Sequence, residues 1–319
     1  MYHRNVFTII LACFSHFSRS LERRGDHNEQ ITSTEAAPGG ARRIHQAAPA
    51  SCAITEAHVA YTLSKIQNAQ MHYSPYPHTV IEDIYSPDVY ACMLKQLPPN
   101  QDAYSRSDGH FKQGEGRYAL LIRSTDDNVG PGILNKKKKK WTPIPASPNI
   151  NSTYWTDWAR AYGAETLKNA WLQKFNVTLA VRSPNWQSIA KKLYMRMELN
   201  RDISGYAIGP HTDAPYKWIT MLYYLPQDAS MSTAGTQIVR STKGTSQKES
   251  KWMDPKDKQW QIVKQAPFIP NTVMAFAICD QSWHAVPKVG NKAVRNTIQT
   301  FIRGVDAKQV PPKGKCPAV

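Results

Sequence analysis

The sequence lacks several features that would assign a protein to a class at once. Its cysteines are odd in number, lie far apart and form no C-x-x-C pair; they are Cys13, Cys52, Cys92, Cys279 and Cys316. This pattern argues against a disulfide framework and a structural zinc site, and it fits a reducing compartment. No apolar run is long enough to predict a membrane-spanning helix, and no internal repeat or known nucleic-acid-binding module is visible.

Negative charge is scarce. The 319 residues hold 40 Lys and Arg against 24 Asp and Glu, a formal net charge of +16. Such an excess suits acidic partners such as nucleic acid, anionic membranes or anionic metabolites, or else it is spread over solvated faces. The second reading is favoured because no nucleic-acid module is visible. With 41% hydrophobic residues the chain can still build a sizeable core, which excludes global disorder.

The first 56 residues do not read as part of a folded domain. Residues 6–17 are mostly apolar, and residues 20–55 are rich in Ala, Gly, Ser, Arg and Gln without a helical or strand period. A signal or organelle transit peptide fits this leader, and so does a plain disordered tail. The expected organisation is a leader over 1–56, a single domain over 57–305 and a C-terminal tail over 306–319.

The first half of the domain, to about residue 194, reads as helical. Ser86-Pro87-Asp88 supplies an N-cap, a first-turn proline and an acid near the positive end of the helix dipole. An aromatic-rich stretch over 155–175 has helical periodicity. Ser183-Pro184 predicts one more helix, which reaches about Tyr194.

The second half predicts β-structure. Short apolar segments separated by turn residues are typical of an antiparallel sandwich or barrel. They lie at residues 194–199, 218–225, 236–239, 272–278 and 296–302. Helices first and strands second indicate an α+β fold, with N-terminal helices flanking a jelly-roll core over 195–303.

The motif His211-Thr212-Asp213 suggests a metal site. Side chains two apart on a strand project to the same side, so this imidazole and carboxylate can bind one ion. His284 follows the apolar segment 272–278, which places it at the end of a later strand, where it can meet the pair across the barrel mouth. Two histidines and one carboxylate that leave the other coordination positions open form the facial triad of non-haem iron(II) oxygenases.

Arg295 follows His284 after a predicted turn. The strand predicted next places Arg295 and Thr297 on one face. A guanidinium with a hydroxyl two residues further on suits a buried carboxylate, although such an arginine alone also fits a surface edge strand. Its position after the three candidate metal ligands favours the functional reading.

Together these motifs resemble a known family. They look like the prolyl-4-hydroxylase-like branch of the 2-oxoglutarate/iron(II) oxygenase superfamily. The segments that carry the likeness are His211-Thr-Asp-Ala-Pro-Tyr-Lys, Trp218-Ile-Thr-Met-Leu-Tyr-Tyr-Leu-Pro, Gly235-Thr236, Trp283-His284 and Arg295-Asn-Thr. The resemblance spans about residues 78–305 and is strongest over 199–303. Its motifs are specific for the superfamily and do not name a substrate.

The resemblance implies a double-stranded β-helix whose iron(II) ligands are His211, Asp213 and His284. It implies that the distal carboxylate of 2-oxoglutarate is bound by Arg295, Thr297 and Tyr224. The implied reaction uses O2 to hydroxylate an organic substrate, a small molecule or a protein side chain, and releases succinate and CO2. Ascorbate dependence is common in this branch, so ascorbate is implied as a further cofactor.

Other readings stay open. The chain could be a non-catalytic cupin-like binding module, or a demethylase of alkylated nucleic acid from the same superfamily. The short step from His284 to Arg295 favours the hydroxylase-like branch over the demethylases. The lysine run over 136–140 reads as a solvated loop. The basic stretch over 241–260 is a lid over the substrate site, a surface insertion, or a surface that stacks on single-stranded nucleic acid.

Overall fold

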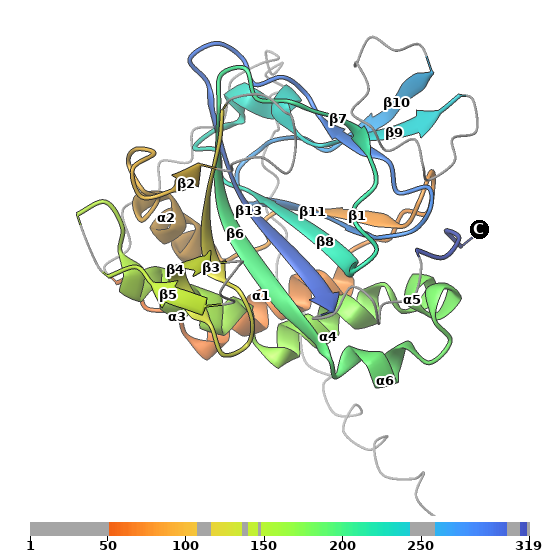
Figure 1. Cartoon of the computed structure of the whole chain (residues 1–319), viewed down its shortest axis with the longest axis horizontal. Coiled ribbons are helices and arrows are strands. Elements are labelled where there is room, and N and C mark those ends of the chain that lie inside the picture. The colour runs from red at the N-terminus through yellow and green to blue at the C-terminus, as the bar shows by residue number, and fades with distance from the viewer. Residues whose placement is uncertain are drawn as a thin grey trace, which may run out of the picture. The chain divides into compact units, whose positions relative to one another are not determined.

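The computed structural model describes residues 51–106, 116–135, 140–145, 148–242, 259–304 and 313–317 (Figure 1). These residues fall within one compact unit, Ala41–Val319. None of the helices in the described ranges has the length and apolar character needed to cross a membrane.

Two antiparallel sheets form the core. The order of the larger sheet is β1 (His78–Ile81), β11 (Thr272–Ala277), β8 (Lys217–Tyr224), β13 (Val294–Gly304), β6 (Leu193–Ile203), β3 (Arg117–Arg123), β4 (Val129–Asn135) and β5 (Lys140–Pro143), with β2 (Ser105–Arg106) also paired to β3. The order of the smaller sheet is β10 (Trp260–Gln265), β9 (Gln237–Ser241), β12 (His284–Val286) and β7 (Ile208–His211). The antiparallel β-core predicted from the short apolar segments is confirmed.

Helices lie along one face of the larger sheet (Figure 1). They are α1 (Glu56–Asn68), α2 (Pro87–Lys95), α3 (Ser152–Tyr162), α4 (Glu165–Lys174), α5 (Asn176–Arg182) and α6 (Trp186–Ala190), and a 3-10 helix η1 (Ala229–Ala234) follows β8. Burial on both faces explains why β11 is almost entirely apolar. In β11, Val273 and Ala275 pack toward the helices, whereas Met274 and Phe276 belong to a second cluster between the sheets.

Local signals located most helices correctly. The helix predicted after Ser86 is α2, and the helical stretch over 155–175 is occupied by α3 and α4, with a break at Gly163. The helix predicted from Ser183-Pro184 to Tyr194 is present as α6 but is shorter than predicted, because it begins at Trp186 and ends at Ala190, and β6 has begun by Leu193. The lysine run lies outside the described residues except for Lys140, which opens β5.

The expectation for the cysteines is also wrong. Cys52 and Cys92 form a disulfide whose Cα atoms are 5.5 Å apart, and Cys279 and Cys316 form a second, with Cα atoms 5.1 Å apart. Partners 40 and 37 residues apart in the chain leave no local pattern by which the sequence could pair them. Because such bonds form and persist in oxidising environments, the inference of a reducing compartment is overturned. Cys13 lies outside the described residues.

Candidate metal centre

The three candidate metal ligands meet at the paired ends of two strands. His211 ends β7 and His284 begins β12, and they are direct partners in the antiparallel register, with ring centroids 4.2 Å apart. Asp213 follows two residues after His211, and its Oδ2 lies 4.0 Å from His284 Nε2. One ligand atom from each residue lies within 4.8 Å of the others. The two histidines thus meet within one sheet, and not across the mouth of the barrel as expected.

Backbone carbonyls determine which ring nitrogens face the site. His211 Nδ1 lies 2.9 Å from the Gly209 carbonyl oxygen, and His284 Nδ1 lies 3.0 Å from that of Ser282. A carbonyl can only accept, so each Nδ1 carries the proton in the neutral ring and each Nε2 keeps its lone pair. Metal-ligating histidines are usually oriented in this way.

The environment favours the ligating form of each group. Burial, assisted by His284, lowers the pKa of His211 to about 3, and burial also lowers the pKa of His284. Burial alone would raise the pKa of Asp213, but the charge of Lys217 and the two histidines outweighs it, and the net shift is downward. Two neutral imidazoles and one ionised carboxylate result, which is the protonation state that a divalent metal requires.

The Asp213 carboxylate is held from both sides. Lys217 Nζ lies 2.5 Å from Oδ1, and the Thr220 hydroxyl on β8 donates to Oδ2 at 2.7 Å. These bonds link the turn after β7 to the larger sheet. The nitrogen and oxygen donor set fits a first-row divalent ion such as iron(II).

The predicted carboxylate-binding residues also lie together. Arg295 on β13 is fully buried, and its guanidinium carbon is 5.6 Å from the centre of the Tyr224 ring. Thr297 is the register partner of Tyr224 on β8, and it is buried as well. The Tyr224 hydroxyl accepts a hydrogen bond from the Thr236 backbone N–H at 3.1 Å.

Sequence reasoning missed an aspartate in this pocket. Asp202 on β6 is directly opposite Arg295, whose Nη1 donates to Oδ2 at 2.9 Å, while the Arg295 Nε donates to the Ala234 carbonyl at 2.8 Å. Arg117 on β3 binds the same carboxylate through Nε at 2.6 Å and Nη2 at 2.8 Å. Two guanidinium groups therefore share one fully buried carboxylate. The sequence did hold a signal for this aspartate. Polar residues alternate along β6 at Glu198, Asn200 and Asp202, which places them on one face of the strand.

Tyr76 is the second residue that was missed. It is fully buried in the cluster between the sheets, and its hydroxyl has no hydrogen-bond partner among the described residues. Burial raises the pKa of its phenol, and the nearby Tyr224 and Asp213 raise it further. Phe276 packs against both Tyr76, at 5.9 Å, and His284, at 4.6 Å between ring centroids. Nothing local to Tyr76 in the sequence indicated this.

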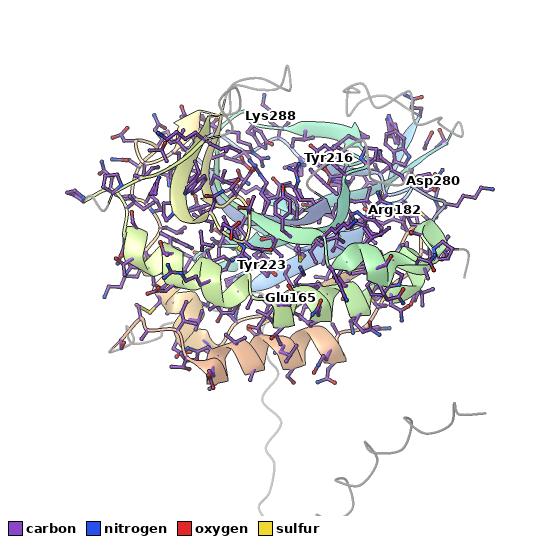
Figure 2. All side chains as sticks on the ribbon, turned by 60° about the horizontal axis from the view of Figure 1, so that its bottom comes forward. Glu165, Arg182, Tyr216, Tyr223, Asp280 and Lys288 are labelled. Atoms are coloured by element: carbon purple, nitrogen blue, oxygen red, sulfur yellow. A yellow bond between two sulfur atoms is a disulfide. The ribbon has the colours of Figure 1, made fainter. Side chains whose placement is uncertain are left out.

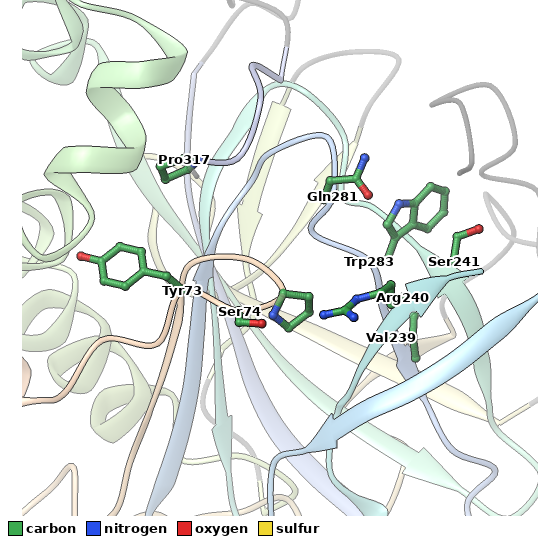
Figure 3. A pocket seen from close by; sticks show the side chains of 9 residues that line it. Tyr73, Ser74, Val239, Arg240, Ser241, Gln281, Trp283 and Pro317 are labelled. Carbon is green, nitrogen blue, oxygen red and sulfur yellow. The ribbon is translucent and has the colours of Figure 1, made fainter. Parts of the chain in front are cut away.

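An open cavity of about 400 Å³ adjoins the strand that carries His284 (Figure 3). It lies between the loop before β1 and the smaller sheet, and its lining residues are Tyr73, Ser74, Pro75, Val239, Arg240, Ser241, Gln281, Trp283 and Pro317. Trp283 is buried against Trp260, with ring centroids 4.7 Å apart. Most of the basic stretch over 241–260 lies outside the described residues.

Comparison with known proteins places the chain near one group of solved structures. No family model and no curated protein matches it. A prolyl-4-hydroxylase from Pseudomonas putida is 10% identical, with a TM-score of 0.42 over 78% of this chain and 100% of that one. A prolyl hydroxylase from Trichoplax adhaerens, solved with a fragment of hypoxia inducible factor, is 10% identical, with a TM-score of 0.42 over 78% of this chain and 90% of that one. An oxidoreductase of the 2OG-Fe(II) oxygenase family from Burkholderia pseudomallei is 12% identical, with a TM-score of 0.38 over 82% of this chain and 96% of that one.

These neighbours are prolyl-4-hydroxylases and members of the 2OG-Fe(II) oxygenase family, the group that the sequence motifs resemble. At these identities and TM-scores, an assignment of function has to come from the residues of the site.

Proposed function

We propose that this protein is an iron(II)- and 2-oxoglutarate-dependent oxygenase, in which His211, Asp213 and His284 bind the metal. The observation that carries the proposal is the meeting of two neutral imidazoles and one ionised carboxylate at the ends of β7 and β12. The Nδ1 atoms of both histidines are bonded to backbone carbonyls, so Nε2 is the atom through which each ring would bind a metal. This donor set leaves room for a co-substrate and O2.

The order of the strands supports a double-stranded β-helix with flanking helices. From β7 to β13 the chain passes from the smaller sheet to the larger and back several times, since β7, β9, β10 and β12 belong to one sheet and β8, β11 and β13 to the other. The candidate metal ligands lie on the smaller sheet and Arg295 lies on the larger. A hydrophobic cluster that contains Tyr76, Tyr224 and Phe276 connects them, because Phe276 contacts His284 and Tyr224 contacts Arg295.

The charge between the sheets supports a carboxylate co-substrate. Arg117, Arg295 and Asp202 carry two positive charges and one negative charge, and the distal carboxylate of 2-oxoglutarate would neutralise the remainder. Arg295 would donate to this carboxylate through the Nη N–H groups that do not bind Asp202. Tyr224 and Thr297 would donate through their hydroxyl groups. The unpartnered Tyr76 hydroxyl would supply one more donor.

When bound, iron(II) and 2-oxoglutarate supply the activation of O2, with conversion of 2-oxoglutarate to succinate and CO2 and hydroxylation of an organic substrate. The protein positions the reactants relative to one another, and its aromatic interior excludes water from the region between the sheets. Lys217 and Thr220 keep Asp213 ionised and oriented. The substrate class proposed is a small molecule or a protein side chain, and ascorbate is proposed to support turnover.

Anaerobic metal binding followed by succinate measurement tests the proposal. The wild type should bind one iron(II) per chain and then convert 2-oxoglutarate to succinate once O2 is admitted. His211→Ala should lose both properties, because two ligands cannot hold the ion in the required geometry. The matched control is His72→Ala, since His72 stacks on His78 at 5.2 Å, away from the candidate ligands. A wild type that binds iron without making succinate would instead favour a non-catalytic cupin-like module.

A further inference from the structure

The segment Lys313–Pro317 lies against the metal centre, and we call it the strap. Its Cys316 is joined by a disulfide to Cys279 in the loop between β11 and β12. The neighbouring Asp280 N–H donates to the Gly314 carbonyl at 3.0 Å, and the Asp280 carboxylate accepts from the Cys316 N–H at 3.0 Å. Near its carboxyl end the chain reaches α5 (Figure 1), and Arg182 at the end of α5 lies on the same side of the molecule as Asp280 (Figure 2). The strap is therefore fixed to the loop that leads into β12.

The strap brings an ammonium group to the candidate metal ligands. Lys313 is only 6% exposed, and its Nζ donates to the hydroxyl of Thr212, the residue between His211 and Asp213. No residue in the described ranges forms an ion pair with Lys313. Burial lowers its pKa to about 8. A buried ammonium whose direct hydrogen-bond partner is a neutral hydroxyl is costly, so direct contact with an anionic ligand would stabilise it.

The charged groups near Lys313 include more cations than carboxylates. The ionised groups that act on Lys313 are the cations Arg182 and Lys217 and the carboxylates of Asp213 and Asp280. Three cations, counting Lys313, thus face two carboxylates before any metal is bound. Bound iron(II) would add positive charge beside Asp213. An anionic group on a ligand would restore the balance, and its contact with a buried ammonium would be strong.

The other end of the strap reaches the cavity. Pro317 lines the cavity of about 400 Å³, and Trp283 and Arg240 line its other side (Figure 3). The strap thus runs from the candidate metal ligands to an open space large enough for a small organic molecule. We propose that the strap is a wall of the organic-substrate site and that Lys313 binds an anionic group of the substrate, a carboxylate or a phosphate. This inference rests on the proposed oxygenase function.

Acetylation of lysines tests the placement of Lys313 without any turnover. Oxidised full-length protein is treated briefly with acetic anhydride, and mass spectrometry compares Lys313 with Lys315, which is exposed in the same strap. Lys313 should react at least about tenfold more slowly, because it must first become exposed by local opening. The two rates should converge in Cys316→Ser. The double variant Cys52→Ser/Cys92→Ser, which removes the other disulfide, should keep the difference. Equal rates in the wild type would overturn the proposal.

Substrate chemistry is tested with matched pairs of probes. Carboxylic acids and phosphate monoesters, each paired with its neutral amide or parent alcohol, are screened for stimulation of succinate production by iron-loaded protein. The anionic members should stimulate, and whether carboxylates or phosphates do so identifies the group. Lys313→Ala should raise the KM of a stimulating anion at least about tenfold, as expected for loss of a charged hydrogen bond. It should leave the KM for 2-oxoglutarate unchanged, and Lys313→Arg should retain part of the affinity.

The control is Lys315→Ala, which should behave as the wild type. Equal stimulation by the neutral members would refute the anionic site, and so would a Lys313→Ala effect confined to the KM for 2-oxoglutarate. A wild type that makes no succinate with any probe would refute the proposed oxygenase function. In that case the acetylation rates still decide whether Lys313 is held against the metal centre.

Discussion

The guanidinium of Arg295 is the group whose removal tests the proposed co-substrate pocket most directly. It is buried, donates to Ala234 and Asp202, and retains N–H groups that can meet a ligand carboxylate. A hydrogen bond to a charged group contributes roughly 1.5–3 kcal/mol. Since about 1.4 kcal/mol corresponds to a tenfold change in affinity, Arg295→Ala should raise the apparent KM for 2-oxoglutarate at least about tenfold.

Two further variants should raise the KM for 2-oxoglutarate by smaller amounts. Arg295→Lys should recover part of the loss, because the charge returns without the planar arrangement of donors. Tyr224→Phe should cost less, about the 0.5–1.5 kcal/mol of one neutral hydrogen bond. Iron(II) binding should stay nearly unchanged in all three variants, since none of these side chains is a candidate ligand.

The assay measures initial rates of succinate formation against 2-oxoglutarate concentration. Arg123→Ala is the matched control for lost stability. Arg123 is also buried and also bonds a backbone carbonyl and a carboxylate, those of Ala159 at 3.1 Å and Asp126 at 2.6 Å. It should unfold more easily without a change in KM. An unchanged KM in folded, iron-loaded Arg295→Ala would refute the pocket assignment.

Other predictions address the metal centre, the interior and the disulfides. His284→Ala should abolish iron(II) binding in anaerobic calorimetry, and retained binding would contradict the ligand set. The pKa of His211 is about 3 and that of His284 is also lowered. Iron affinity should therefore fall much less between pH 7.5 and 5.5 than the roughly hundredfold loss expected for two histidines that titrate at 6.5. The same downward shifts mean that the metal-free protein loses stability as pH falls below about 6.5 toward the folded pKa values, which urea unfolding can measure. Tyr76→Phe should raise the KM for 2-oxoglutarate without lowering the melting temperature, because the Tyr76 hydroxyl has no partner among the described residues. A lowered melting temperature with an unchanged KM would contradict this role of Tyr76. Removal of residues 1–50 should preserve activity, whereas removal of residues 1–56 also deletes Cys52 and should cost roughly 2–4 kcal/mol of unfolding free energy.

Local patterns in the sequence determined much of the architecture. The start of α2 followed from Ser86-Pro87-Asp88, because an N-cap and a first-turn proline act within a few residues. The strands of the core followed from short apolar runs such as that of β11, because burial on both faces selects apolar side chains at every position. His211-Thr212-Asp213 indicated a metal site because residues two apart on an extended chain share a face.

Only the tertiary structure shows which distant residues contact these elements. Arg295 faces Asp202 because β13 pairs with β6 in one register, and a shift by one residue would have turned the guanidinium to the other face. Cys279 and Cys316 pair because the strap returns to the loop before β12, a path that no local propensity specifies. The same return places Lys313 beside Thr212. Contacts between distant residues depend on how the whole chain closes, so the candidate metal-binding motif could be read from the sequence but the groups around it could not.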